Sequence, residues 1–191
     1  MKKAIFLDKD GTLLKDVPYN VEPELVELAP GCERLRPLQD AGYQLIIVSN
    51  QSGLALGYFT ETQLMRAVSR MFELLAEKQV YPLAFYFCPH ATNGVIYPYN
   101  HACGCRKPQP GLILRAARDL DIHLPSSWMI GDILDDVEAG NRAGCHTVLL
   151  DNGNETEWNL NEWREPDYVR ADLSEAARMI LRKENEPHHD S

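Results

Sequence analysis

Two carboxylates close enough to act together follow the first apolar run of the chain. Asp8 and Asp10 stand in the order Asp-Lys-Asp-Gly-Thr, directly after the run Ala4–Leu7. In such a pair one carboxylate can act as a nucleophile, and the other can move protons or help to bind a metal ion. Gly11 permits a sharp turn that keeps both near the end of the run. Asp-rich turns with Gly are also common without any catalytic role, so this motif alone leaves both interpretations open.

Further segments carry polar residues that suit phosphate chemistry. Ser49 ends a second apolar run, and its hydroxyl can donate a hydrogen bond to a phosphate oxygen. Lys107 can neutralise charge on a phosphoryl group and on a nucleophilic carboxylate. Asp132 follows another apolar run, and opposite the first pair it completes an oxygen-rich site suited to Mg²⁺. Asp135 we interpret as a first-turn helix residue that complements the helix dipole. Taken singly, each segment also fits an ordinary loop.

One histidine and three of the five cysteines form a cluster with the residue types of a metal site. Cys88, His90, Cys103 and Cys105 supply four ligands suited to tetrahedral zinc, and four protein ligands leave no position for a water molecule. We therefore predict a structural zinc that fixes a long loop and the basic pair after Cys105. A chance cluster or a disulfide is the alternative, and an odd cysteine count argues against a disulfide framework.

The rest of the sequence alternates short apolar runs with amphipathic stretches, and this pattern predicts the elements that position the polar residues. Continuous apolar strands separated by helices indicate an α/β fold, a three-layer doubly wound parallel sheet. Ligands bind such folds beyond the carboxyl ends of the strands, where the polar residues stand. The predicted strands are 4–7, 43–49, 83–88, 128–130, 147–150 and 168–169, and the predicted helices are 32–41, 60–78, 110–120, 135–143 and 173–183.

The length and composition bound the domain organisation and the class of protein. A chain of 191 residues with 45% hydrophobic residues suits one domain, which we place at 1–184 with a zinc loop at 88–107 and a polar tail at 185–191. The polar segment 151–158, which ends in an aromatic residue, we interpret as a surface loop, with lining of the site entrance as the alternative; the role of the whole loop 151–166 stays open. The net charge of -9 indicates no basic face for nucleic acid. No apolar run approaches the roughly 20 residues of a membrane span, so we expect a cytoplasmic protein with no obligate protein partner.

The order of the motifs over residues 5–150 resembles the haloacid dehalogenase-like phosphohydrolases. These motifs are Asp-x-Asp-Gly-Thr, a strand-end Ser, a Lys and Gly-Asp-x-x-x-Asp. The resemblance implies that Asp8 is the nucleophile and forms an aspartyl-phosphate, while Asp10 is the general acid and then the general base. It implies that Ser49 and Lys107 hold the transferred phosphoryl group.

The same resemblance implies the ligands of the catalytic metal ion. Mg²⁺ would be held by Asp8, the backbone carbonyl of Asp10 and Asp132, with Asp136 supporting the site. A dianionic phosphate ester repels the carboxylate of Asp8 unless cations offset the charge, so this arrangement agrees with the physics of phosphoryl transfer.

The zinc segment is similar to that of the D-glycero-D-manno-heptose 1,7-bisphosphate 7-phosphatases and of the related histidinol-phosphate phosphatases. The stretch 49–53 with Gly57, and the absence of a large cap insertion, resemble the heptose enzymes more closely. Leu56 and Ile133 stand where those enzymes often carry basic residues. By this resemblance the substrate-binding residues are Asp16, Tyr19, Asn50, Gln51, Ser52 and, near the remote phosphate, Arg106.

The resemblance implies an enzyme that removes the 7-phosphate of a heptose bisphosphate during the synthesis of surface-glycan precursors, with Mg²⁺ and Zn²⁺ as cofactors. Hydrolysis of histidinol phosphate or another small phosphate ester is the alternative activity. A non-catalytic binding protein on the same scaffold is a third interpretation, which the presence of both Asp8 and Asp10 disfavours.

Overall fold

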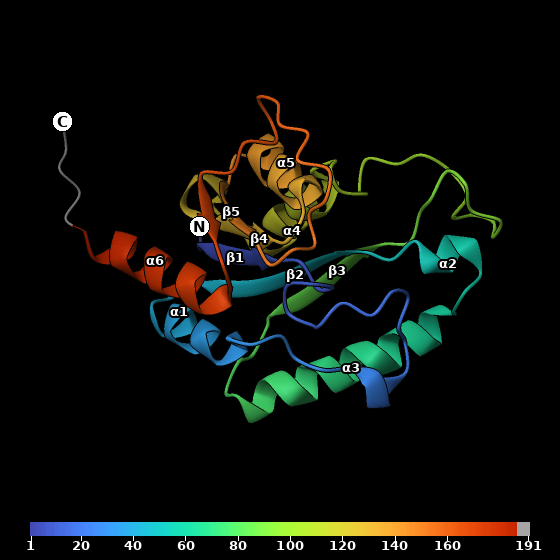
Figure 1. Cartoon of the computed structure of the whole chain (residues 1–191), viewed down its shortest axis with the longest axis horizontal. Helices are drawn as coiled ribbons and strands as arrows, with labels where there is room; N and C mark the ends of the chain where they lie inside the picture. The colour runs from blue at the N-terminus through green and yellow to red at the C-terminus, as the bar shows by residue number, and fades with distance from the viewer. Residues whose placement is uncertain (187–191) are drawn as a thin grey trace.

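A six-stranded, entirely parallel sheet forms the centre of the molecule (Figure 1). The computed structural model describes residues 1–186. The strand order is β3-β2-β1-β4-β5-β6. The strands are β1 (Ala4–Leu7), β2 (Gln44–Asn50), β3 (Ala84–Cys88), β4 (Trp128–Gly131), β5 (His146–Leu150) and β6 (Tyr168–Arg170).

Helices cover both faces of this sheet, as the alternation of apolar runs and amphipathic stretches predicts. They are α1 (Arg36–Asp40), α2 (Gly53–Leu56), α3 (Glu61–Glu77), α4 (Gly111–Leu120), α5 (Leu134–Ala143) and α6 (Leu173–Asn185). Figure 1 shows α4 and α5 on one side of the sheet and α1, α3 and α6 on the other. The three-layer doubly wound fold is therefore confirmed.

Alternate residues of the central strands supply the two halves of the core, because successive side chains of a strand point to opposite faces. Ile5 and Leu7 of β1 pack in one cluster with residues of α1, α3 and α6. Ala4 and Phe6 pack in a second cluster with residues of α4 and α5. All four side chains have no solvent exposure, which explains why the run is apolar throughout.

Some element boundaries differ from the predicted ones for local reasons. The predicted helix 32–41 is a 3₁₀ turn, Cys32–Leu35, followed by the short helix α1. Pro37 stands at the start of α1, where a residue without an N–H group is tolerated. The expected single domain ends within α6, which reaches Asn185, and the rest of the expected tail, 187–191, lies outside the described residues.

The order in which strands join the sheet changes side at β1, although all strands stay parallel. From β1 the chain adds β2 and β3 on one side, and then it returns to place β4 on the other side of β1. Parallel α/β sheets bind ligands at such a switch point, beyond the carboxyl ends of the strands. None of the helices in residues 1–186 is long and apolar enough to cross a membrane.

Candidate active site

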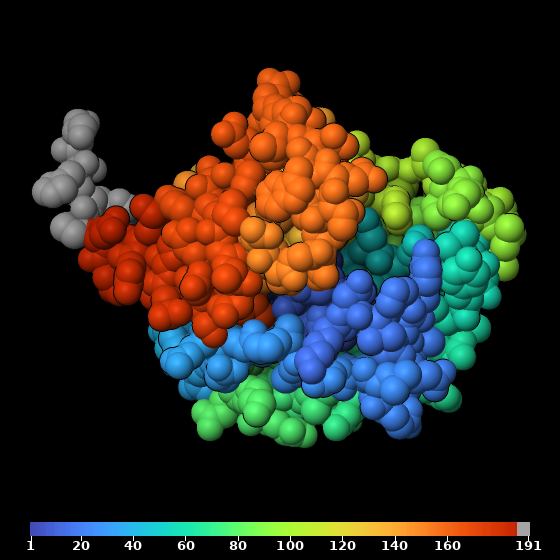
Figure 2. Space-filling model, in the orientation of Figure 1, coloured from blue at the N-terminus to red at the C-terminus, as the bar shows by residue number. Residues whose placement is uncertain are grey.

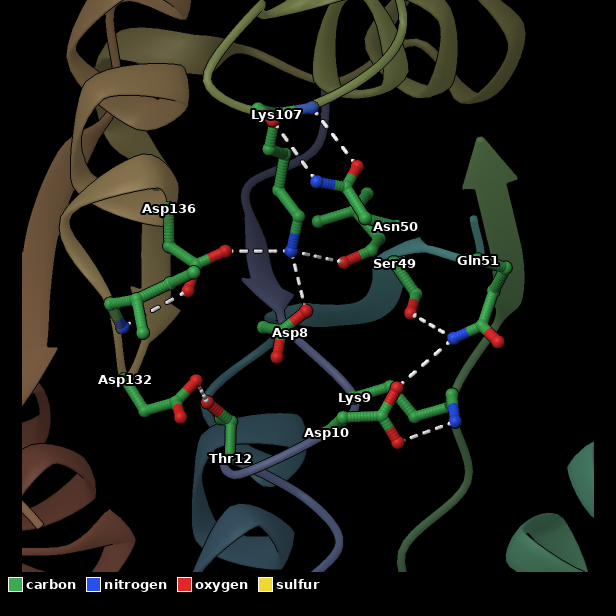
Figure 3. Close-up of polar contacts among 12 residues, drawn as sticks. Asp8, Lys9, Asp10, Thr12, Ser49, Asn50, Gln51, Lys107, Asp132 and Asp136 are labelled. Atoms are coloured by element: carbon green, nitrogen blue, oxygen red, sulfur yellow. Dashed lines mark hydrogen bonds and ion pairs between the residues drawn. The ribbon is translucent and has the colours of Figure 1, made fainter. Parts of the chain in front are cut away.

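Three buried carboxylates meet at the switch point (Figure 3). Asp8 follows β1, and its backbone N–H donates to the carbonyl of Ile130 in β4 at 3.0 Å. Asp132 follows β4, and Asp136 lies in the first turn of α5. Each residue offers a carboxylate oxygen, and these oxygens all lie within 4.8 Å of one another. Hard oxygen ligands at this spacing suit a small divalent cation such as Mg²⁺.

The buried ammonium of Lys107 is the cation of this cluster. Its Nζ donates to Asp8 Oδ1 at 2.5 Å, to Asp136 Oδ1 at 2.6 Å and to the carbonyl of Val48 at 3.0 Å. Asn50 fixes the backbone of Lys107 from two sides, accepting from its N–H and donating to its carbonyl, each at 3.0 Å. Since both amide atoms of Asn50 are engaged, this residue positions Lys107 in the structure.

Burial, together with the charges that neighbour each group, shifts the pKa values of these residues. Burial raises the pKa of Asp8 well above its usual range, Lys107 lowers it, and the neighbouring carboxylates raise it further. Burial, and next Asp136, raise the pKa of Asp132 to about 6. Burial opposes the charge of Lys107, but Asp136 and Asp8 hold the pKa of its ammonium above the usual value. An additional cation among these oxygens would offset the same repulsion.

Two glycines of the motifs give the carboxylates room. Gly11 has a φ of +84°, and a Cβ atom there would lie 2.0 Å from Asp132 Oδ2. A Cβ atom on Gly131 would lie 2.2 Å from the side chain of Asp136. Any other residue at either position would therefore displace a carboxylate of the cluster.

Asp10 stands beside the cluster with both carboxylate oxygens engaged (Figure 3). Lys9 donates to Oδ1 at 2.6 Å, and Gln51 Nε2 donates to Oδ2 at 3.0 Å. The same Gln51 nitrogen lies 2.8 Å from the hydroxyl of Ser49, so it ties Asp10 to the strand-end serine. The Lys9 side chain is 4% exposed, whereas that of Asp10 is 37% exposed and accessible to a substrate.

Two cavities open beside these residues. A cavity of about 100 Å³ next to Asp10 is lined with polar side chains that include Asp16, Tyr19, Gln51 and Ser52. A larger cavity of about 430 Å³ is lined by Arg106 and Lys107, and also by Tyr19, Ser52 and Leu56. The expected substrate-binding residues therefore gather around two hollows that share Tyr19 and Ser52.

The predicted zinc ligands converge at the end of β3, because the far end of the following loop returns there. The sulfur atoms of Cys88, Cys103 and Cys105 lie 3.1, 3.3 and 3.5 Å apart, and the Nδ1 atom of His90 lies 3.3 Å from Cys105 Sγ and 3.5 Å from Cys88 Sγ. A disulfide needs about 2.05 Å, and tetrahedral zinc with bonds of about 2.3 Å to sulfur needs roughly 3.8 Å between ligands. All five cysteines, which lie in the described part, are free, so the cluster fits a closed zinc site.

Comparisons with known proteins agree with this geometry. Residues 104–176 match the HAD-hydrolase-like family. The chain is 43% identical over 155 residues to the D-glycero-beta-D-manno-heptose-1,7-bisphosphate 7-phosphatase of Pasteurella multocida, covering 80% of this chain and 84% of that one. It is 39% identical to the Escherichia coli K12 enzyme of the same name, covering 77% and 78% of the two chains. The chain belongs to this 7-phosphatase family.

A solved member of the 7-phosphatase family has the same fold. The D,D-heptose 1,7-bisphosphate phosphatase of B. bronchiseptica, complexed with magnesium and phosphate, is 30% identical with a TM-score of 0.78, covering 95% of this chain and 99% of that one. The acidic cluster of this chain fits a magnesium site, because its three carboxylates and one buried lysine are the groups that bind a cation and a phosphoryl group. Like its relatives, the chain is a phosphoric monoester hydrolase.

The structure adds site residues that the sequence analysis missed. Thr12 Oγ1 donates to Asp132 Oδ1 at 3.2 Å, and Asn154 Nδ2 donates to Asp132 Oδ2 at 2.8 Å. Lys9, which the sequence presents as a spacer between two aspartates, is a buried ion-pair partner of Asp10. Asn154 belongs to the segment 151–158, which we interpreted as a surface loop with lining of the site as the alternative, and its side chain reaches the acidic cluster, as the alternative predicted. Thr12 could have been identified from its place in the Asp-Gly-Thr motif, but no sequence pattern indicates Asn154.

Proposed function

We propose that this protein removes the 7-phosphate of D-glycero-D-manno-heptose 1,7-bisphosphate, in a Mg²⁺-dependent step of heptose-precursor synthesis for surface glycans such as lipopolysaccharide. The observation that carries the proposal is the arrangement around Asp8. This buried carboxylate pairs with Lys107 on one side, while Asp10 stands accessible on the side of the polar cavity. The relatives that match 77–80% of the chain support the choice of substrate.

The first chemical step uses two carboxylates in different roles. An oxygen of Asp8 attacks phosphorus, a bond forms between that oxygen and phosphorus, and the bond from phosphorus to the sugar oxygen breaks. Asp10 gives a proton to the departing sugar oxygen, which becomes a hydroxyl group. The hydroxyl of Ser49 and the ammonium of Lys107 hold the phosphoryl group during transfer, because Ser49 lies near the carboxyl end of β2 and Lys107 extends its ammonium to Asp8 from the loop before α4.

The second step returns the enzyme to its starting state. Asp10, now a carboxylate, takes a proton from a water molecule that attacks phosphorus, and inorganic phosphate leaves Asp8. Mg²⁺ bound by Asp8, the carbonyl of Asp10 and Asp132 would supply the positive charge that lets a dianionic ester approach a carboxylate. Asp136 contributes by orienting Lys107, with which it forms a buried ion pair.

The two cavities suit a sugar that carries two phosphates. The polar cavity lies next to Asp10, where the departing hydroxyl of the sugar must sit, and Asp16 and Tyr19 offer groups for further hydroxyls. The larger cavity leads to Arg106, whose guanidinium suits a second phosphate. The 7-phosphate is an ester of a primary carbon, so it can reach Asp8 with little hindrance.

We also place this reaction in the cytoplasm. The zinc-type cluster of one histidine and three free cysteines suits a reducing compartment, where thiols persist.

A panel of phosphate esters tests the proposed function. Purified protein with Mg²⁺ is given heptose 1,7-bisphosphate, histidinol phosphate and simple sugar monophosphates, and kcat/KM is measured for each. We expect the highest value for the bisphosphate, and phosphorus NMR should show a product that keeps its 1-phosphate. Asp8→Asn should remove turnover, because an amide does not attack phosphorus. The surface variant Asp40→Asn serves as a matched control. A higher kcat/KM for histidinol phosphate would contradict the heptose assignment.

A further inference from the structure

The loop 151–166, which follows β5, contacts all three segments that carry the acidic cluster. Asn152 Nδ2 donates to the carbonyl of Gly11 at 2.8 Å, in the turn between Asp8 and Thr12. Asn154 Nδ2 donates to Asp132 Oδ2, and Glu155 Oε2 accepts from the backbone N–H that begins α5 at 2.7 Å. Figure 2 shows this segment, in orange, lying against the blue N-terminal segment. The loop therefore ties the ends of β1, β4 and α5 together.

Asn154 contacts the carboxylate of Asp132, whose orientation is restricted by burial and by a second hydrogen bond. Asp132 is 4% exposed, and Thr12 holds its Oδ1 while Asn154 holds its Oδ2. Two donors on the two oxygens define both the rotamer and the rotation of the carboxylate plane. A Cβ atom on Gly11 would lie 2.6 Å from Asn154 Nδ2, so the glycine also leaves space for this contact.

We propose that Asn154 is a positioning residue for the catalytic cation, which it serves by fixing the carboxylate of Asp132 at the distance from Asp8 that the cation requires. This inference rests on the proposed function, because it assumes a Mg²⁺ site between these carboxylates. Groups that orient a metal ligand typically contribute about 10- to 100-fold to metal affinity. Asn154 acts through Asp132 and makes no contact of its own with the substrate or the reacting atoms.

Binding of Mn²⁺ alone, followed by electron paramagnetic resonance of the free ion, tests the inference without any turnover. We expect the Kd for Mn²⁺ to rise about 10- to 100-fold in Asn154→Ala. The kcat at saturating Mg²⁺ should fall much less than the metal affinity, since the lost contact orients a ligand and makes no bond to the substrate. Asn159→Ala is the matched control, because Asn159 is an exposed residue of the same loop with no side-chain hydrogen bond among the described residues.

The variants separate failure of the inference from failure of the proposed function. Asp132→Asn should lose Mn²⁺ binding whether or not Asn154 positions the Asp132 carboxylate. If Asn154→Ala binds Mn²⁺ as tightly as the wild type while Asp132→Asn does not, Asn154 has no positioning role and the metal site stands. If Asp132→Asn also binds Mn²⁺ like the wild type, the proposed metal site itself is wrong. Zinc content and circular dichroism of each variant establish that the fold is intact, so that weak binding reports on the site.

Discussion

The ammonium of Lys107 lies 2.5 Å from Oδ1 of Asp8, where the two side chains are 3% and 10% exposed. Lys107 is also the ion-pair partner of Asp136, so a single cation balances a cluster of buried carboxylates. Removing one partner of a buried ion pair leaves an uncompensated charge and typically costs about 3–5 kcal/mol. We therefore expect Lys107→Met to lower the melting temperature of the metal-free protein sharply.

Added Mg²⁺ should restore part of the stability lost in Lys107→Met, because the metal supplies positive charge to the same oxygens. Thermal unfolding with and without Mg²⁺ measures this effect. Lys15→Met is the control, since Lys15 pairs with Glu27 on the surface and such pairs contribute about 0–1 kcal/mol. Equal losses in the two variants, or no recovery with Mg²⁺, would argue against a buried charge cluster that binds the metal.

The stabilisation by Mg²⁺ should grow as the pH rises from about 5 to 7. Burial, and next Asp136, raise the pKa of Asp132 from 3.8 to about 6. A carboxyl whose pKa is raised in the folded state stabilises the fold while protonated, and that contribution is lost as the pH rises through about 6. Protons and Mg²⁺ compete for the same oxygens, so the shift in melting temperature on adding Mg²⁺ should be small at pH 5 and larger at pH 7. In Asp132→Asn this dependence should flatten, and an unchanged dependence would exclude Asp132 as its source.

The main site residues could be predicted because a parallel sheet brings the ends of its strands to one edge. Asp8 and Asp132 follow strands that are far apart in the sequence, and the alternating pattern places them at the same edge of the sheet. That their strands, β1 and β4, are neighbours is given by the strand order of the structure. The role of Lys107 was predicted from the order of the motifs. The fold shows what holds Lys107 at the site, since the side chain of Asn50, at the end of β2, fixes its backbone.

The parts that could not be predicted depend on tertiary contacts without a sequence period. Asn154 reaches Asp132 from a loop whose path is set by several hydrogen bonds to distant segments. Lys9 reads as surface because it is charged, yet its side chain lies beside a cavity lined by Leu14 and Val68, among others, and only its end meets Asp10. The engagement of Asn50 with the backbone likewise depends on a loop 57 residues away in the sequence.

Asp10→Asn should slow the reaction unequally for different substrates. The proposed task of Asp10 is proton transfer, which is typically worth about 10²–10⁴ in rate. A sugar phosphate has a poor leaving group and needs that proton, whereas an aryl phosphate does not. Single-turnover rates for both substrates measure the difference, with Asp8→Asn as the reference because it should abolish both. Equal losses on the two substrates in Asp10→Asn would contradict the general-acid role.

One zinc ion per chain should be bound, and it should not take part in the chemical step. Four protein ligands, Cys88, His90, Cys103 and Cys105, fill a tetrahedral site. Cys103→Ser should lower the melting temperature and weaken substrate binding, because the loop that carries Lys107 loses an anchor. Elemental analysis of tag-free protein measures the metal, and Cys145→Ser, a change at a buried cysteine outside the cluster, is the control. Protein that contains no zinc and no iron would refute the site.

Arg106→Ala should reduce kcat/KM about 10- to 100-fold for a sugar bisphosphate and little for a monophosphate, since a charged hydrogen bond contributes about 1.5–3 kcal/mol. Arg106 lines the larger cavity, and its Nη1 donates to the carbonyl of His90 at 3.3 Å, so the zinc loop orients its guanidinium. Leu56, which lines the same cavity, is apolar and offers the second phosphate no charge. Arg106 should therefore contribute more to binding that phosphate than it would beside a basic residue at position 56. Arg115→Ala, on the exposed face of α4, is the matched control. If Arg106→Ala costs the same factor with both substrates, Arg106 is not the anchor of the second phosphate.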